Sequence, residues 1–169
     1  MSRVRSLAAA AVMVTGVAAA GCVPGSGALP ALTGVVDLDA GTSHACVVTS
    51  DGRVRCWGMN DYQQLGNVGL ALAGAYSSNV AVPVDGVGGA TQVAVGGDFS
   101  CALRSSGTVA CWGGGRWGQL GNGVFETYSQ PPVTVLGVSG ATEITAGYGF
   151  ACALVAGGAV KCWGSNEVG

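Results

Sequence analysis

One unit occurs three times along the second part of the chain. The copies read DLDAGTSHACVVTSDGRVRCWGMNDYQQLG from Asp37, TQVAVGGDFSCALRSSGTVACWGGGRWGQLG from Thr91 and EITAGYGFACALVAGGAVKCWGSNEVG from Glu143. Each copy has a glycine five residues before its first cysteine and a tryptophan eleven residues after it. Because a period of about 50 residues is typical of propellers and solenoids, the chain is predicted to consist of stacked repeat units.

Each copy contains two short β-prone runs separated by a turn that contains glycine. In the first copy, residues 46–49 and 53–57 flank the turn at Gly52. Glycine adopts the positive φ that tight turns require, so each pair of runs is predicted to form a β-hairpin. Further β-prone runs lie upstream of the later hairpins, at 80–84 with 92–95 and at 132–136 with 143–146. The sequence therefore predicts about four strands per repeat, as in a propeller blade.

The composition favours an all-β fold. Glycine supplies 31 of the 169 residues, while the strong helix formers Glu, Lys and Gln are scarce. The apolar share of 49% argues against disorder. Successive strand residues such as Val47 and Val48 are apolar, which places apolar side chains on both faces of a strand. The sheets are therefore predicted to lie between neighbouring blades.

The unit resembles the regulator of chromosome condensation repeat, also called the alpha-tubulin suppressor repeat. The residues that carry the resemblance are His44, Trp57-Gly58 with Asn60, Gln64-Leu65-Gly66, Trp112-Gly113 and Gly118-Gln119-Leu120-Gly121. The resemblance covers about residues 37–169. It implies a β-propeller with about seven four-stranded blades of about 50 residues, of which three are present here.

A closed ring of this kind implies about 350 residues. We therefore expect the chain to be part of a longer protein, with repeats at about 34–66, 80–121 and 132–169, the last one truncated. The alternative is that several copies associate to close a ring. In either case the outer faces of the first and last blades lack a partner within the chain, which favours self-association through open blade edges.

The first 33 residues are predicted to be an export signal followed by a tether. Arg3 and Arg5 precede an apolar run over 7–20, which is too short to span a membrane. The residues before Cys22 resemble a bacterial lipobox, so 1–21 is predicted to be a lipoprotein-type signal peptide and Cys22 a lipid anchor at the cell envelope. Plain secretion is the alternative, because Ala19 stands where the lipobox pattern prefers Leu. Residues 22–33 are predicted to be a flexible tether.

The other six cysteines form three pairs, each ten residues apart with a glycine turn between them. Opposed residues in a hairpin have Cα atoms about 4.5 to 5.5 Å apart, within the range of a disulfide. Export to an oxidising compartment also favours bridges. Buried free thiols are the alternative, and zinc is not expected because the pairs lack metal-ligand spacing. The predicted disulfides are Cys46–Cys56, Cys101–Cys111 and Cys152–Cys162.

Several other side chains stand out. His44 is the single histidine, and since the other copies have phenylalanine in its place, it is interpreted as a packing or hydrogen-bonding residue at the hairpin entry. The repeated tryptophans are predicted to pack between blades. Trp117 is interpreted as lying outside the repeat register, at the place of Gln63. Since Trp and Arg are enriched at protein interfaces, the candidate partner contacts are Arg116, Trp117 and, in the next loop, Tyr128.

The charge pattern limits the function further. With a formal charge of −2 and 9% charged residues, the chain is not predicted to bind nucleic acid. The acidic residues Asp51, Asp61 and Asp98 share no equivalent placement, so neither an enzyme nor a cofactor is predicted. We expect a non-catalytic module, exported and lipid-anchored, that binds a protein partner. The alternatives are a truncated or vestigial structural repeat protein and a secreted inhibitor of an extracellular enzyme.

Overall fold

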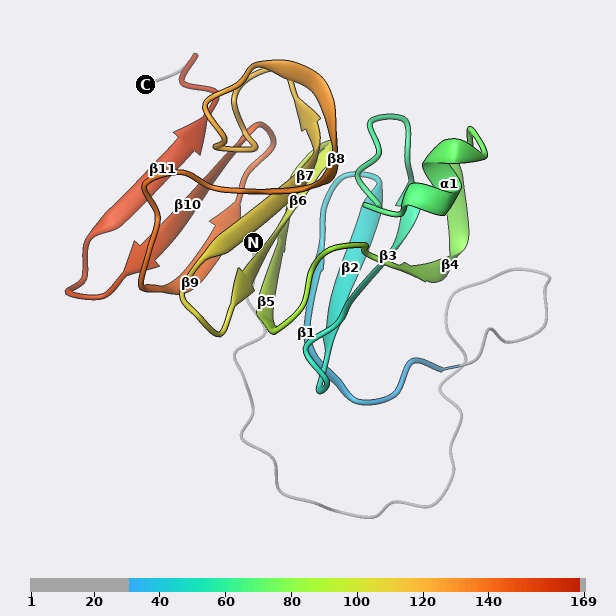
Figure 1. Ribbon diagram of the computed structural model, residues 1–169, viewed down its shortest axis with the longest axis horizontal. Coiled ribbons are helices and arrows are strands. Elements are labelled where there is room, and N and C mark those ends of the chain that lie inside the picture. The colour runs from blue at the N-terminus through green and yellow to red at the C-terminus, as the bar shows by residue number, and fades with distance from the viewer. Residues whose placement is uncertain (1–30, 168–169) are drawn as a thin grey trace. The chain divides into compact units, whose positions relative to one another are not determined.

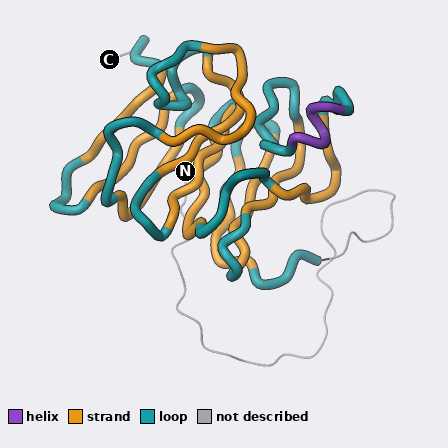
Figure 2. The backbone as a smooth tube through the Cα atoms, in the orientation of Figure 1, coloured by secondary structure: helices purple, strands orange, loops and turns teal. Residues whose placement is uncertain are grey.

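The computed structural model describes residues 31–167, without the side chains of 126–131. The regular secondary structure of this part is almost entirely β-strand, which confirms the predicted all-β fold (Figure 2). The elements are β1 (Val35–Ala40), β2 (His44–Thr49), β3 (Val54–Met59), α1 (Val68–Leu72), β4 (Ser77–Pro83), β5 (Ala90–Val95), β6 (Phe99–Arg104), β7 (Val109–Gly115), β8 (Glu126–Thr134), β9 (Ala141–Ala146), β10 (Phe150–Val155) and β11 (Val160–Gly164). No helix within 31–167 is long and apolar enough to cross a membrane.

The strands form three antiparallel sheets that follow the chain order. The first two sheets have the orders β1-β2-β3-β4 and β5-β6-β7-β8, and the third has the order β9-β10-β11. Figure 1 shows the sheets side by side, with the β5–β8 sheet in the middle. Strands β1 and β2 contact β5, and β5 and β6 contact β9. Each sheet therefore packs face to face on the next, as the blades of a propeller do.

The sequence analysis assigned two runs of residues to the wrong blades. The runs 80–84 and 132–136 were grouped with 92–95 and 143–146 as the upstream strands of the second and third blades. The structure places β4 as the fourth strand of the first sheet, where Val82 pairs with Cys56. It likewise places β8 as the fourth strand of the second sheet, where Val133 pairs with Cys111. A run of apolar residues predicts a strand but does not specify its neighbour, and here the chain turns back to β3 or β7 before it crosses to the next sheet.

The predicted hairpins are present in the expected register. Gly52 and Gly107 have φ values of 75° and 77° in the turns, as tight turns require. Each predicted cysteine pair is directly opposed across its hairpin and joined by a disulfide. The Cα atoms of Cys46 and Cys56 lie 4.1 Å apart.

Removing the central disulfide is expected to lower the free energy of unfolding by about 2 to 3 kcal/mol, because the bridge closes a loop of about ten residues in the unfolded chain. The double variant Cys101→Ala and Cys111→Ala tests this in a urea titration. Alanine is used instead of serine, because serine would bury an unpaired hydroxyl group. The difference from the wild type should shrink when both proteins are reduced. Equal stability of oxidised and reduced wild type would show that the three pairs are not bridged.

The core lies between the sheets. At the first junction, Val48 and Leu65 from the first repeat pack against Val93 and Trp112 of the second. At the second junction, a similar cluster joins the middle sheet to Ile144 and its neighbours on the third. All seven residues of β7 are buried. These observations confirm the prediction that the sheets lie between neighbouring blades.

The two outer sheet faces are more open than the inner ones. Phe150 on the third sheet is 45% exposed, while its equivalent Phe99 on the middle sheet is fully buried. Leu38 on the first sheet is exposed, while its equivalent Val93 is buried. The same repeat positions are therefore core residues where a neighbouring sheet covers them and surface residues where none does.

Candidate functional site

The repeated tryptophans connect one blade to the next. The indole Nε1 of Trp112 donates a hydrogen bond to the backbone carbonyl of Gln64 at 2.9 Å, and Trp163 repeats this bond to Gln119 at 2.9 Å. A Cβ added to Gly66 would lie 2.8 Å from the Trp112 ring. The Gln-Leu-Gly segment is therefore a seat for the tryptophan of the following blade, and its glycine is required for the close approach. The predicted packing role is confirmed for Trp112 and Trp163.

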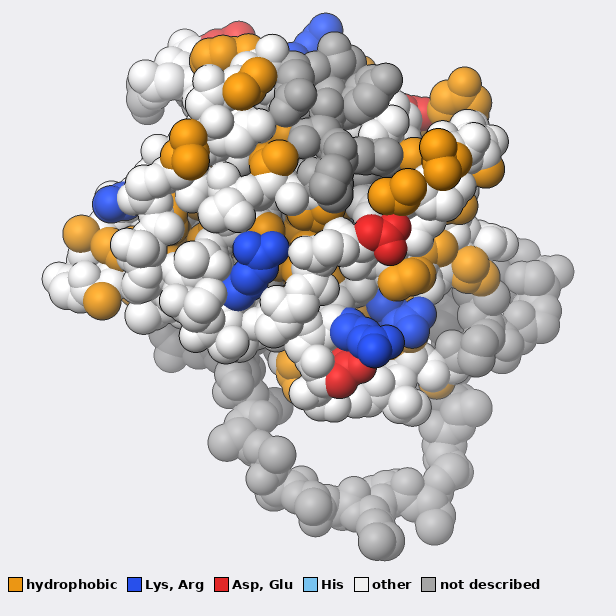
Figure 3. Space-filling view, in the orientation of Figure 1, with side chains coloured by type: hydrophobic (Ala, Val, Ile, Leu, Met, Phe, Trp, Pro, Cys, Tyr) orange, Lys and Arg blue, Asp and Glu red, His pale blue; other side chains and the backbone are white. Residues whose placement is uncertain are grey.

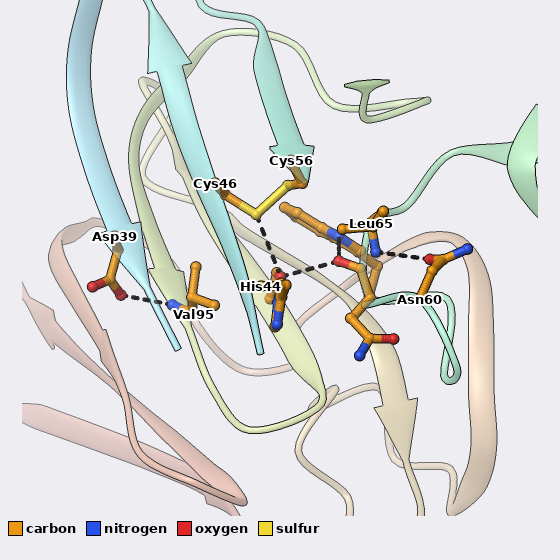
Figure 4. Close-up of a disulfide and its surroundings, with 10 residues drawn as sticks. Asp39, His44, Cys46, Cys56, Asn60, Leu65 and Val95 are labelled. Atoms are coloured by element: carbon orange, nitrogen blue, oxygen red, sulfur yellow. Dashed lines mark hydrogen bonds between the residues drawn. A yellow bond between two sulfur atoms is a disulfide. The ribbon is translucent and has the colours of Figure 1, made fainter. Parts of the chain in front are cut away.

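Polar side chains also cross the junctions. The Asp37 carboxylate accepts a hydrogen bond from the Val93 backbone N–H at 2.7 Å, and Asp39 does the same with Val95 at 2.7 Å (Figure 4). Burial raises the pKa of Asp37, while the Val93 hydrogen bond acts in the opposite direction. These two carboxylates are occupied in fixing β1 against β5. The sequence pattern gave no signal for this role, because it depends on which strand edge faces the carboxylates.

His44 and Ser100 form a sealed pair at the first junction. The His44 Nε2 lies 2.7 Å from the Ser100 Oγ, which in turn donates to the Gln64 carbonyl at 3.2 Å, close to the Cys46–Cys56 disulfide (Figure 4). Burial lowers the pKa of His44 to about 4. His44 is 5% exposed and Ser100 is fully buried, so no substrate can reach the pair. The prediction that His44 is a hydrogen-bonding residue at the hairpin entry is confirmed.

A solvent-exposed hollow lies at the opposite end of the sheets from the hairpin turns. Its volume is about 310 Å³, and it is formed by the β1–β2, β5–β6 and β9–β10 loops together with the segments that follow β3 and β7. We call it the loop-end hollow. Its lining includes Asp61, Tyr62, Asp98, Arg116, Trp117 and Tyr148. Two of the predicted partner contacts, Arg116 and Trp117, thus lie together in one surface depression.

The register assigned to Trp117 was wrong. The backbone N–H of Trp117 donates to the Gln119 Oε1 at 2.8 Å, and the backbone N–H of Tyr62 donates to the Gln64 Oε1 at 2.9 Å. Trp117 is therefore the equivalent of Tyr62 and lies within the repeat register. Gln63, with a φ of 63°, matches Gly118 with a φ of 75°. The glycine run before Arg116 obscured this alignment, because glycine positions give little side-chain pattern to match.

Trp117 packs against a residue that the sequence analysis missed. Its ring centroid lies 6.1 Å from that of Tyr148, with the ring planes tilted by 39°. Tyr148 is 68% exposed. A sequence signal was available, because an aromatic residue stands here where the other copies have Thr42 and Gly97. Aromatic rings that pair at the surface, with one side open to solvent, provide contact area for a partner.

The hollow carries charged groups for which no ion pair is found among residues 31–167. Asp61 and Arg116 are exposed and Asp98 is partly buried. An ion pair joins Arg53 and Asp51 at the other end of the sheets. Within 31–167 no group of three or more His, Cys, Asp or Glu side chains could hold a metal ion. Figure 3 shows one face of the molecule, on which charged side chains are few and dispersed.

The Tyr128 side chain and the predicted anchor Cys22 lie outside the described residues. In strand β8 the Tyr128 backbone pairs with Gly114. Trp57 is the repeat equivalent of Trp112, but on the first sheet it is only partly buried.

Comparison with known proteins identifies the repeat. A family model described as the Regulator of chromosome condensation (RCC1) repeat matches residues 35–64, 90–119 and 141–169, and a second model of the same description matches 51–103 and 106–154. Human HERC2, an E3 ubiquitin-protein ligase, is 32% identical over 141 residues, which are 80% of this chain and 3% of HERC2. The mitochondrial RCC1 domain-containing protein RUG3 of Arabidopsis thaliana is 31% identical over 136 residues, which are 79% of this chain and 29% of RUG3.

Solved structures share the fold. Human WBSCR16 superposes with a TM-score of 0.66 at 25% identity, over 77% of this chain and 33% of that protein. Prp20p of Saccharomyces cerevisiae gives a TM-score of 0.68 at 21% identity, over 82% of this chain and 33% of Prp20p. The chain thus spans about a third or less of these relatives. The three matched repeats, their conserved spacing and the stacked blades show that this chain belongs to the regulator of chromosome condensation (RCC1) repeat family.

Proposed function

We propose that the chain is a non-catalytic protein-binding module and that the loop-end hollow is its contact surface. The observation that carries this proposal is the Trp117–Tyr148 pair. Tyr148 is largely exposed and packs on a partly exposed Trp117, beside charged side chains for which no ion pair is found among the described residues. Tryptophan, tyrosine and arginine are the residue types enriched at binding hot spots.

Structures of a relative support protein binding as a use of this fold. Yeast RCC1 (Prp20) has been crystallised with Kap60 bound, and Prp20p has been studied for binding to Gsp1p and histones. The identity of the partner of the present chain is set by its own loops, since the fold alone does not specify a ligand. The sealed His44–Ser100 pair supports a function without catalysis.

Substituting a residue that lines the loop-end hollow is expected to reduce the amount of partner protein that the chain captures. Immobilised full-length chain carrying Trp117→Ala should recover the partner from an extract of surface proteins at least tenfold less than the wild type, because a hot-spot aromatic contributes about 2 kcal/mol or more. The matched control is Tyr76→Ala, which removes a tyrosine that is 75% exposed and does not line the loop-end hollow. Equal recovery by the wild type and Trp117→Ala would rule out the loop-end hollow as the contact surface.

The same experiment separates the alternative functions. A truncated or vestigial repeat protein would capture no partner that depends on any surface variant. A secreted inhibitor would capture an extracellular enzyme and lower its activity in proportion to binding. The proposed display module would capture a partner without affecting an enzymatic activity.

The chain is further proposed to be exported and held at the cell envelope through a lipid on Cys22. Support comes from Arg3, the apolar run over 7–20 and the small residues before Cys22. The three bridged cysteine pairs are also typical of an oxidising compartment.

Substituting Cys22→Ala is expected to move the chain from the membrane fraction to the soluble fraction, because it removes the thiol that carries the lipid. Fractionation followed by intact-mass measurement checks this. The matched control is Ser26→Ala in the same segment, which should leave the chain in the membrane fraction. A soluble wild type without added acyl mass would favour the plain secretion alternative.

A further inference from the structure

The loop-end hollow carries two carboxylates with unused hydrogen-bonding capacity. Asp98 accepts one long hydrogen bond, from the Gln119 Nε2 at 3.4 Å. Asp61 lines the hollow, and no hydrogen bond or ion pair of its side chain is found in the described part of the chain. An ionised carboxylate offers about four acceptor sites, so both groups can accept further donors. The carboxylates on β1 differ, because backbone N–H groups already occupy them.

Aromatic rings stand beside these carboxylates. The aromatic residues that line the hollow are Tyr62, Trp117 and Tyr148. The rings of Trp117 and Tyr148 are tilted and are not stacked face to face. The face of an aromatic ring carries negative electrostatic potential and attracts a cation within about 6 Å of its centre. Rings and carboxylates therefore favour the same kind of ligand group, a cationic one.

One buried amide also points to a peptide ligand. Gln64 is 2% exposed and lines the hollow, and its Oε1 accepts from the Tyr62 backbone N–H. In the second repeat, the equivalent Gln119 donates from its amide nitrogen to Asp98. The residue that corresponds to Asp98 in the first repeat is Ser43, which has no carboxylate to accept from Gln64. No hydrogen bond from the Gln64 amide nitrogen to another described residue is found. That nitrogen can donate to a carbonyl of a bound chain.

Arg116 limits the net negative charge of the hollow and therefore the number of cations that it can bind. It lines the same hollow but lies more than 4.0 Å from either carboxylate. The formal charge of Asp61, Asp98 and Arg116 together is −1, which favours one cation and disfavours an anion. Resting on the protein-binding function proposed above, we infer that the loop-end hollow receives a lysine or arginine side chain of the partner protein.

A pair of short peptides tests this inference on the full chain. The probes are acetyl-Gly-Lys-Gly-amide and acetyl-Gly-norleucine-Gly-amide, which share length and backbone but differ in the charge. The indole resonance of Trp117 and the amide resonance of Gly97 report binding by NMR titration. The lysine peptide should shift both signals in a salt-sensitive way, and the norleucine peptide should bind roughly tenfold more weakly, because it lacks both the charge and the cation–π contact.

Three variants give results of different sign. Asp98→Asn should weaken binding of the lysine peptide by roughly fivefold to tenfold, since it removes one of the two attracting charges. Arg116→Gln should strengthen that binding, because it removes the like charge. The control Asp51→Asn changes the net charge by the same amount as Asp98→Asn, but it lies in the β2–β3 turn at the other end of the sheets, and it should leave the affinity unchanged.

The outcomes are distinguishable from a failure of the protein-binding function. Equal shifts with both peptides, no shift with either, or a loss of affinity in Arg116→Gln would overturn the inference. A titration with chitotriose that shifts the same resonances while the lysine peptide does not would assign the hollow to carbohydrate instead. If Trp117→Ala abolishes partner capture while the lysine peptide fails to bind, the contact surface stands and only the basic side chain is refuted.

Discussion

Replacing Trp112 with alanine is expected to lower the free energy of unfolding by about 3 to 5 kcal/mol, the range for removing a fully buried aromatic side chain. Trp112 is fully buried at the first blade junction, and its indole nitrogen donates to the Gln64 carbonyl. The variant leaves a cavity between two sheets and removes one of the two hydrogen bonds that the Gln64 carbonyl accepts. The measurement is equilibrium unfolding in urea of the oxidised full chain.

Trp57→Ala is the matched control for this prediction. Trp57 is the same residue at the same repeat position, but on the first sheet it is partly exposed, and no hydrogen bond of its indole is found in the described region. Its removal should cost less than that of Trp112, because part of its surface stays in water in the folded chain and no indole hydrogen bond is lost. Equal losses in the two variants would show that stability does not come from packing between blades.

Trp112→Phe separates the two contributions. It keeps much of the apolar volume and removes the indole nitrogen, so it should cost about 1 to 2 kcal/mol. A loss as large as that of Trp112→Ala would assign most of the effect to the hydrogen bond on the Gln64 carbonyl. A negligible loss would assign it to packing alone.

The contribution of His44 to the free energy of unfolding is expected to fall by about 3 kcal/mol as the pH is lowered from about 6.5 to about 4. The His44 pKa is lowered to about 4 in the folded chain, since burial disfavours the imidazolium, and it is near 6.5 when the chain is unfolded. The unfolded state therefore binds a proton first as the pH falls. The stabilisation is fully present above 6.5 and is lost progressively through this window.

His44→Phe should remove this pH dependence. Phenylalanine is the residue that the second and third repeats have at this position, as Phe99 and Phe150. Ser100 keeps its hydrogen bond to the Gln64 carbonyl in the variant, so no polar group is orphaned. Urea midpoints of wild type and variant at pH 7 and pH 4.5 give the comparison, and the carboxylates common to both proteins cancel in the difference. Parallel losses in the two proteins would contradict the role of His44.

The candidate surface was only partly predictable from the sequence. Arg116 and Trp117 were identified because their residue types are common at interfaces, and the structure places both in the loop-end hollow. Tyr148 was missed, since it comes from the β9–β10 loop of the next blade and meets Trp117 only when the blades stack. Asp61 and Asp98 were not recognised as parts of one site, because they lie in different repeats at positions that are not equivalent, and only the stacking of the blades brings them to the same hollow.

The sequence by itself determined the repeat unit, the hairpins and the pairing of cysteines within each hairpin. These features depend on contacts between residues about ten positions apart, and local turn chemistry specifies them. The tertiary structure alone decided that β4 belongs to the first sheet, that Trp112 seats on the Gln-Leu-Gly segment of the preceding repeat, and that Tyr148 reaches Trp117. Those contacts join residues from different repeats or across a long loop. They arise from the packing of one sheet face on the next, and a residue's type does not specify which face will cover it.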